Sequence, residues 1–326
     1  MDAKEKAKFQ QEAASKSADA QRARGAVLSR APPEPKPTAG EVQLGTRVEV
    51  CWQCTTLEAT RLIGEGAYGS VYECQSAAGA RYAVKLYGRS AGENLDNEAA
   101  AYKRLSAHPN ILALWGAVTA TTDDRLGLIF ELGHPLSEYL RDRRLPLQLD
   151  REPKSLAKQL RVRWQVAVQL SQGLDFMHKL EVIHCDVKVS NAIVQMDTNV
   201  VKWCDLGLAS RSGTFVVANE KYTAVCRPPE LGQIGDKSIR IAPSADVWAY
   251  GCTVFSVLSA SPAAYLFPDR SVLYCKKFVT TRLSTAVGHD VEGQRVISQM
   301  LKQSPLERIS LASFMSKGLE RIRVWS

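Results

Sequence analysis

The chain has 326 residues, of which 45% are hydrophobic and 23% charged, and it holds 21 glycines and 14 prolines. This composition excludes collagen-like, low-complexity and wholly disordered chains, and the length suits one large domain or two medium ones. No stretch approaches the roughly 18 uninterrupted apolar residues of a membrane span, and the first residues lack the apolar core of a secretory signal. We therefore expect a globular intracellular protein, cytoplasmic, nuclear or both, with no membrane partner.

The formal net charge is +8, yet no run of five or six basic residues occurs. The excess positive charge therefore predicts a solvated surface and no nucleic-acid partner. The eight cysteines are scattered along the chain, which suits a reducing compartment. The one close pair, Cys51 and Cys54, has no second pair or nearby histidine to complete a zinc site.

Residues 1–40 differ from the rest because they are rich in Ala, Lys, Gln and Ser and end in the proline-rich stretch 31–37. Proline-rich segments are stiff linkers, and alanine offers little apolar area to bury. We expect a disordered or weakly helical tail and linker over 1–40 and an N-terminal extension over 41–56. A partner-binding helix in the tail is the alternative.

Residues 58–63, 70–74 and 80–87 alternate as short strands bounded by turns that contain glycine, which predicts a small antiparallel sheet. Between the first two strands lies the loop Gly64-Glu65-Gly66-Ala67-Tyr68-Gly69, whose bare backbone can approach phosphates closely. Strand-type residues follow this loop where a dinucleotide-binding fold would begin a helix, so the pattern favours a strand–turn–strand cover over a nucleotide.

In the strand 80–87, the two-residue alternation places Ala83 and Lys85 on one face. In the next predicted helix, Glu98 recurs with Leu95 and Tyr102 at helical spacing, so a carboxylate lies within an apolar stripe. A buried carboxylate needs a partner, and we expect Lys85 to supply it. The alternative is a glutamate at the edge of the stripe that reaches water.

Longer helical periods begin after residue 155, and a further helix is predicted over 244–258. Strands first and helices afterwards indicate an α+β arrangement of two lobes. Between these helices lies a segment that reads His184-Cys185-Asp186-Val187-Lys188-Val189-Ser190-Asn191 and is followed, after a strand–turn–strand, by Asp205-Leu206-Gly207.

These two segments resemble the H-R-D-x-K-x-x-N catalytic loop and the D-F-G metal motif of eukaryotic protein kinases. The glycine loop, Ala83-Val84-Lys85 and Pro228-Pro229-Glu230 also occur in the family's order. The resemblance covers about residues 57–322. It implies an N-lobe over 57–132 with a small antiparallel sheet and one key helix, a mainly helical C-lobe over 133–322, and ATP between the lobes.

The resemblance also implies a role for each matching residue, because phosphoryl transfer needs a carboxylate near the substrate hydroxyl, metal ligands, and cations on the phosphates. Asp186 would orient or deprotonate the hydroxyl, and Lys188 would steady the transferring phosphate. Asn191 and Asp205 would hold Mg²⁺, with Mn²⁺ as an alternative ion, and Lys85, fixed by Glu98, would hold the α- and β-phosphates. The implied nucleotide contacts are Ile63, Gly64, Glu65, Gly66, Ala67, Tyr68, Gly69, Val71, Ala83, Lys85, Phe130, Glu131, Gly133 and Ile193.

Two structural features are implied in the same way. Asp246 resembles the buried aspartate that anchors the catalytic loop, and Glu230 with Arg308 resembles the family's internal ion pair. Three residues depart from the family pattern without removing a catalytic group, and these are Cys185 for arginine, Leu206 for phenylalanine and Pro228 for alanine.

The segment before Pro229 is similar to the activation segment of the group that includes cyclin-dependent, mitogen-activated and dual-specificity kinases, because of Arg227. Ala218 occupies the position at which cyclin-dependent members of this group carry their activating threonine. The residues at the positions of the arginines that would grip a phosphate are all non-basic, namely Asn97, Cys185 and Ser210.

We therefore expect activation without phosphorylation in this segment, with a Glu220–Arg227 ion pair that holds it open. A solvated surface pair is the alternative. Ser212, Thr214 and Tyr222 are other candidate phosphorylation sites that lack an evident clamp, and Thr223 resembles the threonine that contacts Asp186 and Lys188.

The sequence thus predicts a serine/threonine protein kinase that uses Mg·ATP and acts on protein substrates, since Lys188 follows Asp186 by two places as in that type. A regulatory protein is a further expected partner. The alternatives are a pseudokinase scaffold that binds ATP with little turnover, and a small-molecule kinase of related fold.

Overall fold

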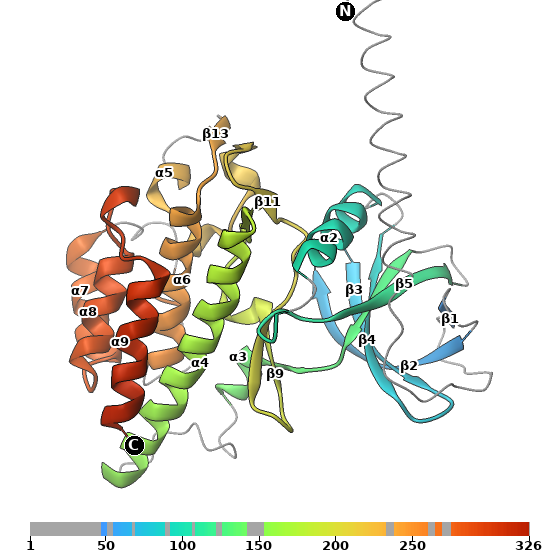
Figure 1. Cartoon of the computed structure of the whole chain (residues 1–326), viewed down its shortest axis with the longest axis horizontal. Coiled ribbons are helices and arrows are strands. Elements are labelled where there is room, and N and C mark those ends of the chain that lie inside the picture. The colour runs from blue at the N-terminus through green and yellow to red at the C-terminus, as the bar shows by residue number, and fades with distance from the viewer. Residues whose placement is uncertain are drawn as a thin grey trace, which may run out of the picture. The chain divides into compact units, whose positions relative to one another are not determined.

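The computed structural model describes residues 47–50, 55–66, 69–88, 92–105, 108–121, 126–141, 153–232, 238–259, 265–268 and 275–325. The predicted tail, the Cys51–Cys54 pair and the loop residues Ala67 and Tyr68 lie outside the described residues. The chain divides into two compact units, of which the first comprises Met1–Ala107 and Leu112–Leu132 and the second His108–Ile111 and Gly133–Ser326. Each unit has its own architecture (Figure 1).

The first unit is an antiparallel barrel in the strand order β1-β2-β3-β4-β6-β5. Its strands are β1 Arg47–Val50, β2 Thr55–Gly66, β3 Gly69–Ser76, β4 Arg81–Tyr87, β5 Leu114–Thr121 and β6 Gly127–Glu131. The predicted antiparallel sheet is confirmed. The barrel is closed by β1, which pairs with both β2 and β5 and lies in the stretch that the sequence suggested only as an extension.

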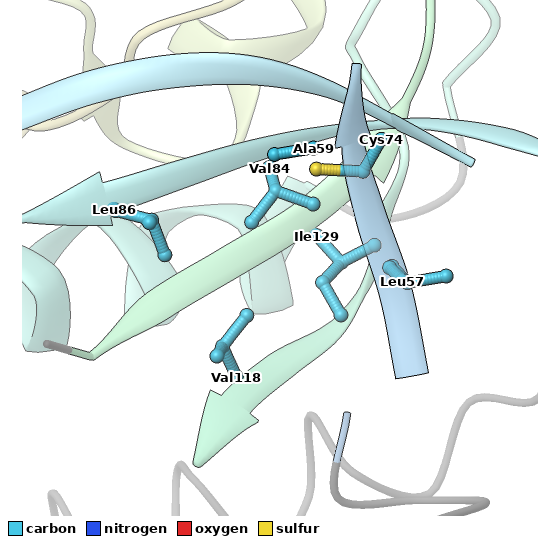
Figure 2. Close-up of a cluster of buried hydrophobic side chains, with 7 residues drawn as sticks. All are labelled: Leu57, Ala59, Cys74, Val84, Leu86, Val118 and Ile129. Carbon is cyan, nitrogen blue, oxygen red and sulfur yellow. The ribbon is translucent and has the colours of Figure 1, made fainter. Parts of the chain in front are cut away.

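Every second side chain of β4 contributes to the hydrophobic core of this unit. Val84 and Leu86 are fully buried and cluster with Ile129, Val118 and other apolar side chains inside the barrel (Figure 2). Because successive side chains of a strand point to opposite faces, the other face of β4 carries Ala83 and Lys85, as predicted. The burial of Val84 and Leu86 therefore fixes the side to which Lys85 points.

Helix α2, Gly92–Leu105, presents a single apolar stripe, as its spacing predicted. Leu95, Glu98 and Tyr102 are 3%, 1% and 1% exposed, so Glu98 lies within the stripe and does not reach water at its edge. The last turn carries Lys103 and Arg104, where positive charge complements the helix dipole.

The second unit is mainly helical. Its helices are α3 Leu136–Tyr139, α4 Pro153–Lys179, α5 Pro229–Gly232, α6 Pro243–Leu258, α7 Lys276–Ala286, α8 Val291–Met300 and α9 Leu311–Val324. Helix α6 is buried from Ala245 to its end, and α4 packs against both α6 and α9 (Figure 1). Helices α7 and α8 fall in and after a stretch whose helix boundaries the sequence did not define. No helix in the described ranges is long and apolar enough to cross a membrane.

Short antiparallel sheets shape the loops of this unit. They pair β9 Ala192–Gln195 with β10 Val200–Trp203 and β7 His134–Pro135, β8 Val182–Ile183 with β11 Ser210–Arg211, and β12 Phe215–Val217 with β13 Ser238–Arg240. The β9–β10 hairpin pairs Ala192 with Trp203 at its open end, so the residues that flank the hairpin, Asn191 and Cys204, become neighbours. The backbone N–H of Cys204 donates to the carbonyl of Asn191 at 2.9 Å.

Candidate active site

In the first unit, Lys85 and Glu98 form the expected ion pair. Lys85 Nζ lies 2.7 Å from Glu98 Oε2, and the two side chains are 12% and 1% exposed. The hydroxyl of Tyr87 donates to the same Glu98 oxygen, and Lys85 Nζ lies 5.3 Å from the centre of the Tyr87 ring. Tyr87 was not among the predicted site residues, although the alternation that places Lys85 on this face of β4 also places Tyr87 there.

The three glycines of the loop between β2 and β3 differ in what the fold requires of them. A Cβ atom on Gly69 would lie 2.0 Å from the carbonyl oxygen of Leu86, where β3 pairs with β4. At Gly64 and Gly66 the nearest atoms would be 3.8 and 3.9 Å away, which is ordinary contact. Gly69 is therefore needed by the sheet, whereas the bare backbone at Gly64 and Gly66 leaves room that a ligand can use.

The other nucleotide-contact candidates of the first unit lie on or beside this sheet. Ala83 pairs with Phe130 across β4 and β6, and both are buried, while Val71 pairs with Lys85 across β3 and β4. Ile63 and Glu65 lie on β2, where Glu65 pairs with Ser70 as the loop closes. Glu131 ends β6, and its Oε1 accepts from the N–H of Ala113 at 2.6 Å.

Two candidates from distant segments meet in the second unit. Gly133 lies directly against Ile193 of β9, since a Cβ atom on Gly133 would be 2.4 Å from Ile193 Cδ1. The pairing of β7 with β9 places Pro135 opposite Ile193 and explains this approach. A side chain at position 133 would displace Ile193.

Asp186 is the centre of the polar cluster in the second unit. It is 7% exposed, and its Oδ2 accepts from Asn191 Nδ2 and lies near Lys188 Nζ, each at 2.8 Å. Its Oδ1 accepts from the N–H of Thr223 at 3.0 Å and from Thr223 Oγ1 at 2.8 Å. Lys188 Nζ also donates to Thr223 Oγ1 at 2.8 Å, so the expected contacts of Thr223 are confirmed.

The opposite charges of Asp186 and Lys188 each favour the ionised form of the other group. Burial alone would raise the pKa of Asp186, but Lys188, Thr223 and His184 outweigh it and leave the pKa below its ordinary value. Burial alone would lower the pKa of Lys188, but Asp186 outweighs it and leaves that pKa raised. Both groups are therefore charged at neutral pH.

Asn191 and Asp205 have the oxygen donors that suit a magnesium ion. Asn191 gives its Nδ2 hydrogens to the carboxylate and carbonyl of Asp186, which leaves Oδ1 as its metal-binding atom. The Cys204–Asn191 backbone bond brings Asp205 to the neighbouring position. In proteins, Mg²⁺ is usually bound by one or two carboxylate or amide oxygens together with substrate phosphates.

Asp246, at the start of α6, anchors the catalytic loop as expected. It is fully buried, and its carboxylate accepts from the N–H groups of His184 at 2.8 Å and Cys185 at 3.1 Å. His178 Nε2 and the Tyr222 hydroxyl complete its contacts at 2.8 Å each. Burial would raise the pKa of Asp246, but His178 and His184 outweigh it, so the carboxylate stays ionised.

The hypothesis of a Glu220–Arg227 ion pair is wrong. Arg227 is 6% exposed and donates to the backbone carbonyls of Lys221 at 3.1 Å and Tyr222 at 3.2 Å. Among the ion pairs of the described ranges, none joins it to Glu220, which is exposed. A buried guanidinium takes the nearest acceptors, and here these are carbonyls of its own segment.

Of the departures from the kinase pattern, Cys185 and Leu206 are fully buried. Burial raises the pKa of the Cys185 thiol far above its ordinary value, so it stays a neutral thiol that donates to the carbonyl of Ile183. The expected Glu230–Arg308 pair is confirmed, with two bonds of 2.7 and 2.6 Å.

This arrangement of barrel, helical unit, Lys–Glu pair and Asp–Lys–Thr cluster defines a protein kinase domain. The family model described as protein kinase domain matches residues 57–318, and the chain belongs to this family. Protein kinases act on protein substrates and use ATP and Mg²⁺.

The chain is also similar to individual proteins that are named as kinases. Serine/threonine-protein kinase PLK4 of Xenopus laevis is 26% identical, over 78% of this chain and 26% of the relative. Mitogen-activated protein kinase kinase kinase 1a of Physcomitrium patens is 31% identical, over 61% and 25%. Cyclin-dependent kinase-like 4 of Mus musculus is 30% identical, over 64% and 57%. The chain thus matches about a quarter of the length of the first two relatives.

Proposed function

We propose that the chain is a serine/threonine protein kinase that transfers the γ-phosphate of Mg·ATP to hydroxyls of protein substrates. The bonding around Asp186 carries this proposal, because both oxygens of that carboxylate are fixed by Lys188, Asn191 and Thr223. Family membership and the similarity to serine/threonine-protein kinase PLK4 and to a mitogen-activated protein kinase kinase kinase support the reaction class.

The binding roles divide between the two units. Bound Mg·ATP supplies the phosphoryl group and the divalent charge that neutralises the phosphates. In the first unit, Lys85 would bind the α- and β-phosphates, and Glu98 with Tyr87 holds its ammonium group in place. In the second unit, Asn191 and Asp205 would hold the metal ion through oxygen atoms.

The bonding of Asp186 indicates its part in the reaction. Contacts to both of its oxygens hold the carboxylate in one orientation, so Asp186 orients the substrate hydroxyl. Phosphoryl transfer depends mainly on positioning and charge neutralisation, and little base strength is needed. Lys188 supplies positive charge beside the oriented hydroxyl, and Thr223 bridges the two groups.

The kinase group, the domain bounds, the cellular location and the regulatory partner are also proposals. Arg227 and the similarity to cyclin-dependent kinase-like 4 support the group of cyclin-dependent, mitogen-activated and dual-specificity kinases. The catalytic domain spans 57–322, with lobes over 57–132 and 133–322, and the protein acts in the cytoplasm, the nucleus or both, under a regulatory protein. A scaffold with little turnover is less favoured, since the family's nucleotide, metal and catalytic residues are all present.

The test is transfer of γ-phosphate from Mg·ATP to a generic basic protein and to a degenerate Ser/Thr peptide array. Asp186→Asn should reduce transfer by about 100-fold or more, because misplacement of reacting groups costs about that much. Asp197→Asn is the matched control, because it makes the same chemical change on an exposed turn and should leave transfer unchanged. A folded protein that binds ATP without transfer would make the scaffold the better reading.

A further inference from the structure

Tyr222 combines three features that the roles above do not use. It is a bulky residue, it is 3% exposed, and its backbone has a φ of +61°. A left-handed backbone at a bulky residue costs free energy and persists only where its surroundings fix it. Cys185 and Asp205 have similar positive φ angles, so three of the five non-glycine residues with positive φ in the described ranges lie in the catalytic loop, the metal motif and this segment.

Three hydrogen bonds fix Tyr222, and two of them lead to the catalytic loop or its anchor. Its hydroxyl donates to Asp246 Oδ1 at 2.8 Å, and its N–H donates to the carbonyl of Cys185 at 2.8 Å. Its own carbonyl accepts from Arg227 at 3.2 Å. The carboxylate that binds the phenol is the one that holds the N–H of Cys185, so one residue ties the segment to the loop that carries Asp186.

The conformation of Tyr222 also determines where Thr223 lies. Thr223 is the next residue, and both its N–H and its hydroxyl donate to Asp186 Oδ1. A rotation of the backbone at Tyr222 would therefore withdraw two of the donors that fix the catalytic carboxylate. Lys188 would lose its bond to Thr223 in the same movement.

Further contacts hold the segment within the second unit. β12 pairs with β13, Lys221 Nζ donates to the carbonyl of Leu208 at 2.8 Å, and Arg211 pairs with Glu181 at 2.8 Å. Ser210, at a position where a phosphate-gripping arginine would stand, bonds to the carbonyl of Leu208. The described bonds of the segment thus hold it without a modified side chain.

We propose that Tyr222 is a positioning residue for phosphoryl transfer, and that its buried phenol fixes the segment to the catalytic loop in place of a phosphorylated side chain. This inference rests on the proposed function. It also corrects the reading of Tyr222 as a phosphorylation site, because a buried hydroxyl bonded to Asp246 is not accessible to another kinase. Burial and the Asp246 carboxylate hold the pKa of Tyr222 well above its ordinary value, so the phenol remains a donor.

The test compares Tyr222→Phe with Tyr250→Phe. Tyr250 is a matched control because it is also fully buried and its hydroxyl donates to the carbonyl of Ala167, between α6 and α4. A hydrogen bond to a charged group corresponds to roughly a 10- to 100-fold effect. Tyr222→Phe should lower kcat about that much with little change in KM for ATP, whereas Tyr250→Phe should lower the melting temperature and leave kcat unchanged.

A second measurement does not depend on turnover. Amide hydrogen exchange at His184, Cys185 and Thr223 should accelerate in Tyr222→Phe and stay at the wild-type rate in Tyr250→Phe, because only the first variant loosens the loop. Wild-type kcat together with wild-type exchange in Tyr222→Phe would overturn the inference. If the wild-type protein transfers no phosphate, the proposed function fails, and exchange still decides the role of Tyr222.

The second half of the proposal is that the segment is held without a phosphorylated side chain. Phosphatase treatment of the wild-type protein tests this half and needs no variant. Transfer should be unchanged after treatment, because the residues at the positions of the phosphate-gripping arginines, Asn97, Cys185 and Ser210, are all non-basic. A large loss of transfer, restored by prior autophosphorylation, would show that a phosphate clamp exists and would overturn this half.

Discussion

Lys85 and Asp186 are both fixed in place, but by different means. In the first unit, Lys85 pairs with the buried carboxylate of Glu98, 13 residues away on the helix that follows its strand. Asp186 is held in the second unit by near neighbours and by Thr223, 37 residues away, while its loop is anchored to Asp246 on α6. The Lys85 contact therefore depends on two elements that are adjacent in the chain, whereas the contacts of Asp186 depend on segments that are distant in the chain.

The largest effect is expected when the Lys85–Glu98 pair is broken. Lys85→Met leaves Glu98 ionised and buried beside Tyr87, and breaking a buried pair on one side costs about 3–5 kcal/mol of unfolding free energy. Phosphate transfer should fall by more than about 100-fold as the phosphates lose their cation. Chemical denaturation and transfer assays measure the two losses.

The double variant Lys85→Met/Glu98→Gln is the control for this prediction. It removes the uncompensated charge while an amide oxygen still accepts from Tyr87. Stability should recover in large part, and activity should not. Recovery of both would mean that Lys85 has only a structural role.

Two substitutions in the glycine loop should separate an effect on stability from an effect on ATP binding in the first unit. Gly69→Ala forces a Cβ atom against the carbonyl of Leu86 and should cost about 1–3 kcal/mol of stability, as overpacking does. Gly66→Ala meets no such obstacle and should leave the melting temperature unchanged while raising KM for ATP. Thermal unfolding beside ATP titration of the rate decides this, and equal stability losses in both variants would contradict it.

The charges of the Asp186 cluster predict a particular pH dependence. The pKa of Asp186 is lowered on folding, so its contribution to stability is present above its unfolded value of about 3.9 and is lost as pH falls through the folded value. The pKa of Lys188 is raised, so its contribution is present below its unfolded value of about 10.4 and is lost only above that. The stability difference between wild type and Asp186→Asn should be constant from about pH 5 to 9 and change below about 4. A difference that already varied between pH 5 and 7 would mean that the pKa of Asp186 is raised.

The smallest effect is expected at Glu220. This residue is exposed and forms no ion pair with Arg227 in the part of the chain that the structure describes. Glu220→Gln should therefore change turnover by less than about twofold and stability by less than about 0.5 kcal/mol, as for other surface sites. A substantial loss of turnover in steady-state assays would restore the ion-pair hypothesis.

Local periodicity determined much of what the sequence predicted correctly. The alternation in β4, the stripe of α2 and the β9–β10 hairpin depend on backbone geometry over a few residues, so they are visible in the sequence. The Lys85–Glu98 pair followed from two such patterns together with the cost of burying a lone carboxylate. Tyr87 was available to the same reasoning.

Only the tertiary structure decided which distant side chains share an acceptor. Asp246 binds His178 and Tyr222 from two other segments, and no spacing in the sequence predicts that meeting. The closure of the barrel by β1 likewise depends on the chain's path, because a strand's partners are set by register over long separations. Arg227 was misassigned for the same reason. Its charge suggested Glu220, but burial and the left-handed turn at Tyr222 gave it backbone carbonyls as partners, and burial is a property of the folded chain alone.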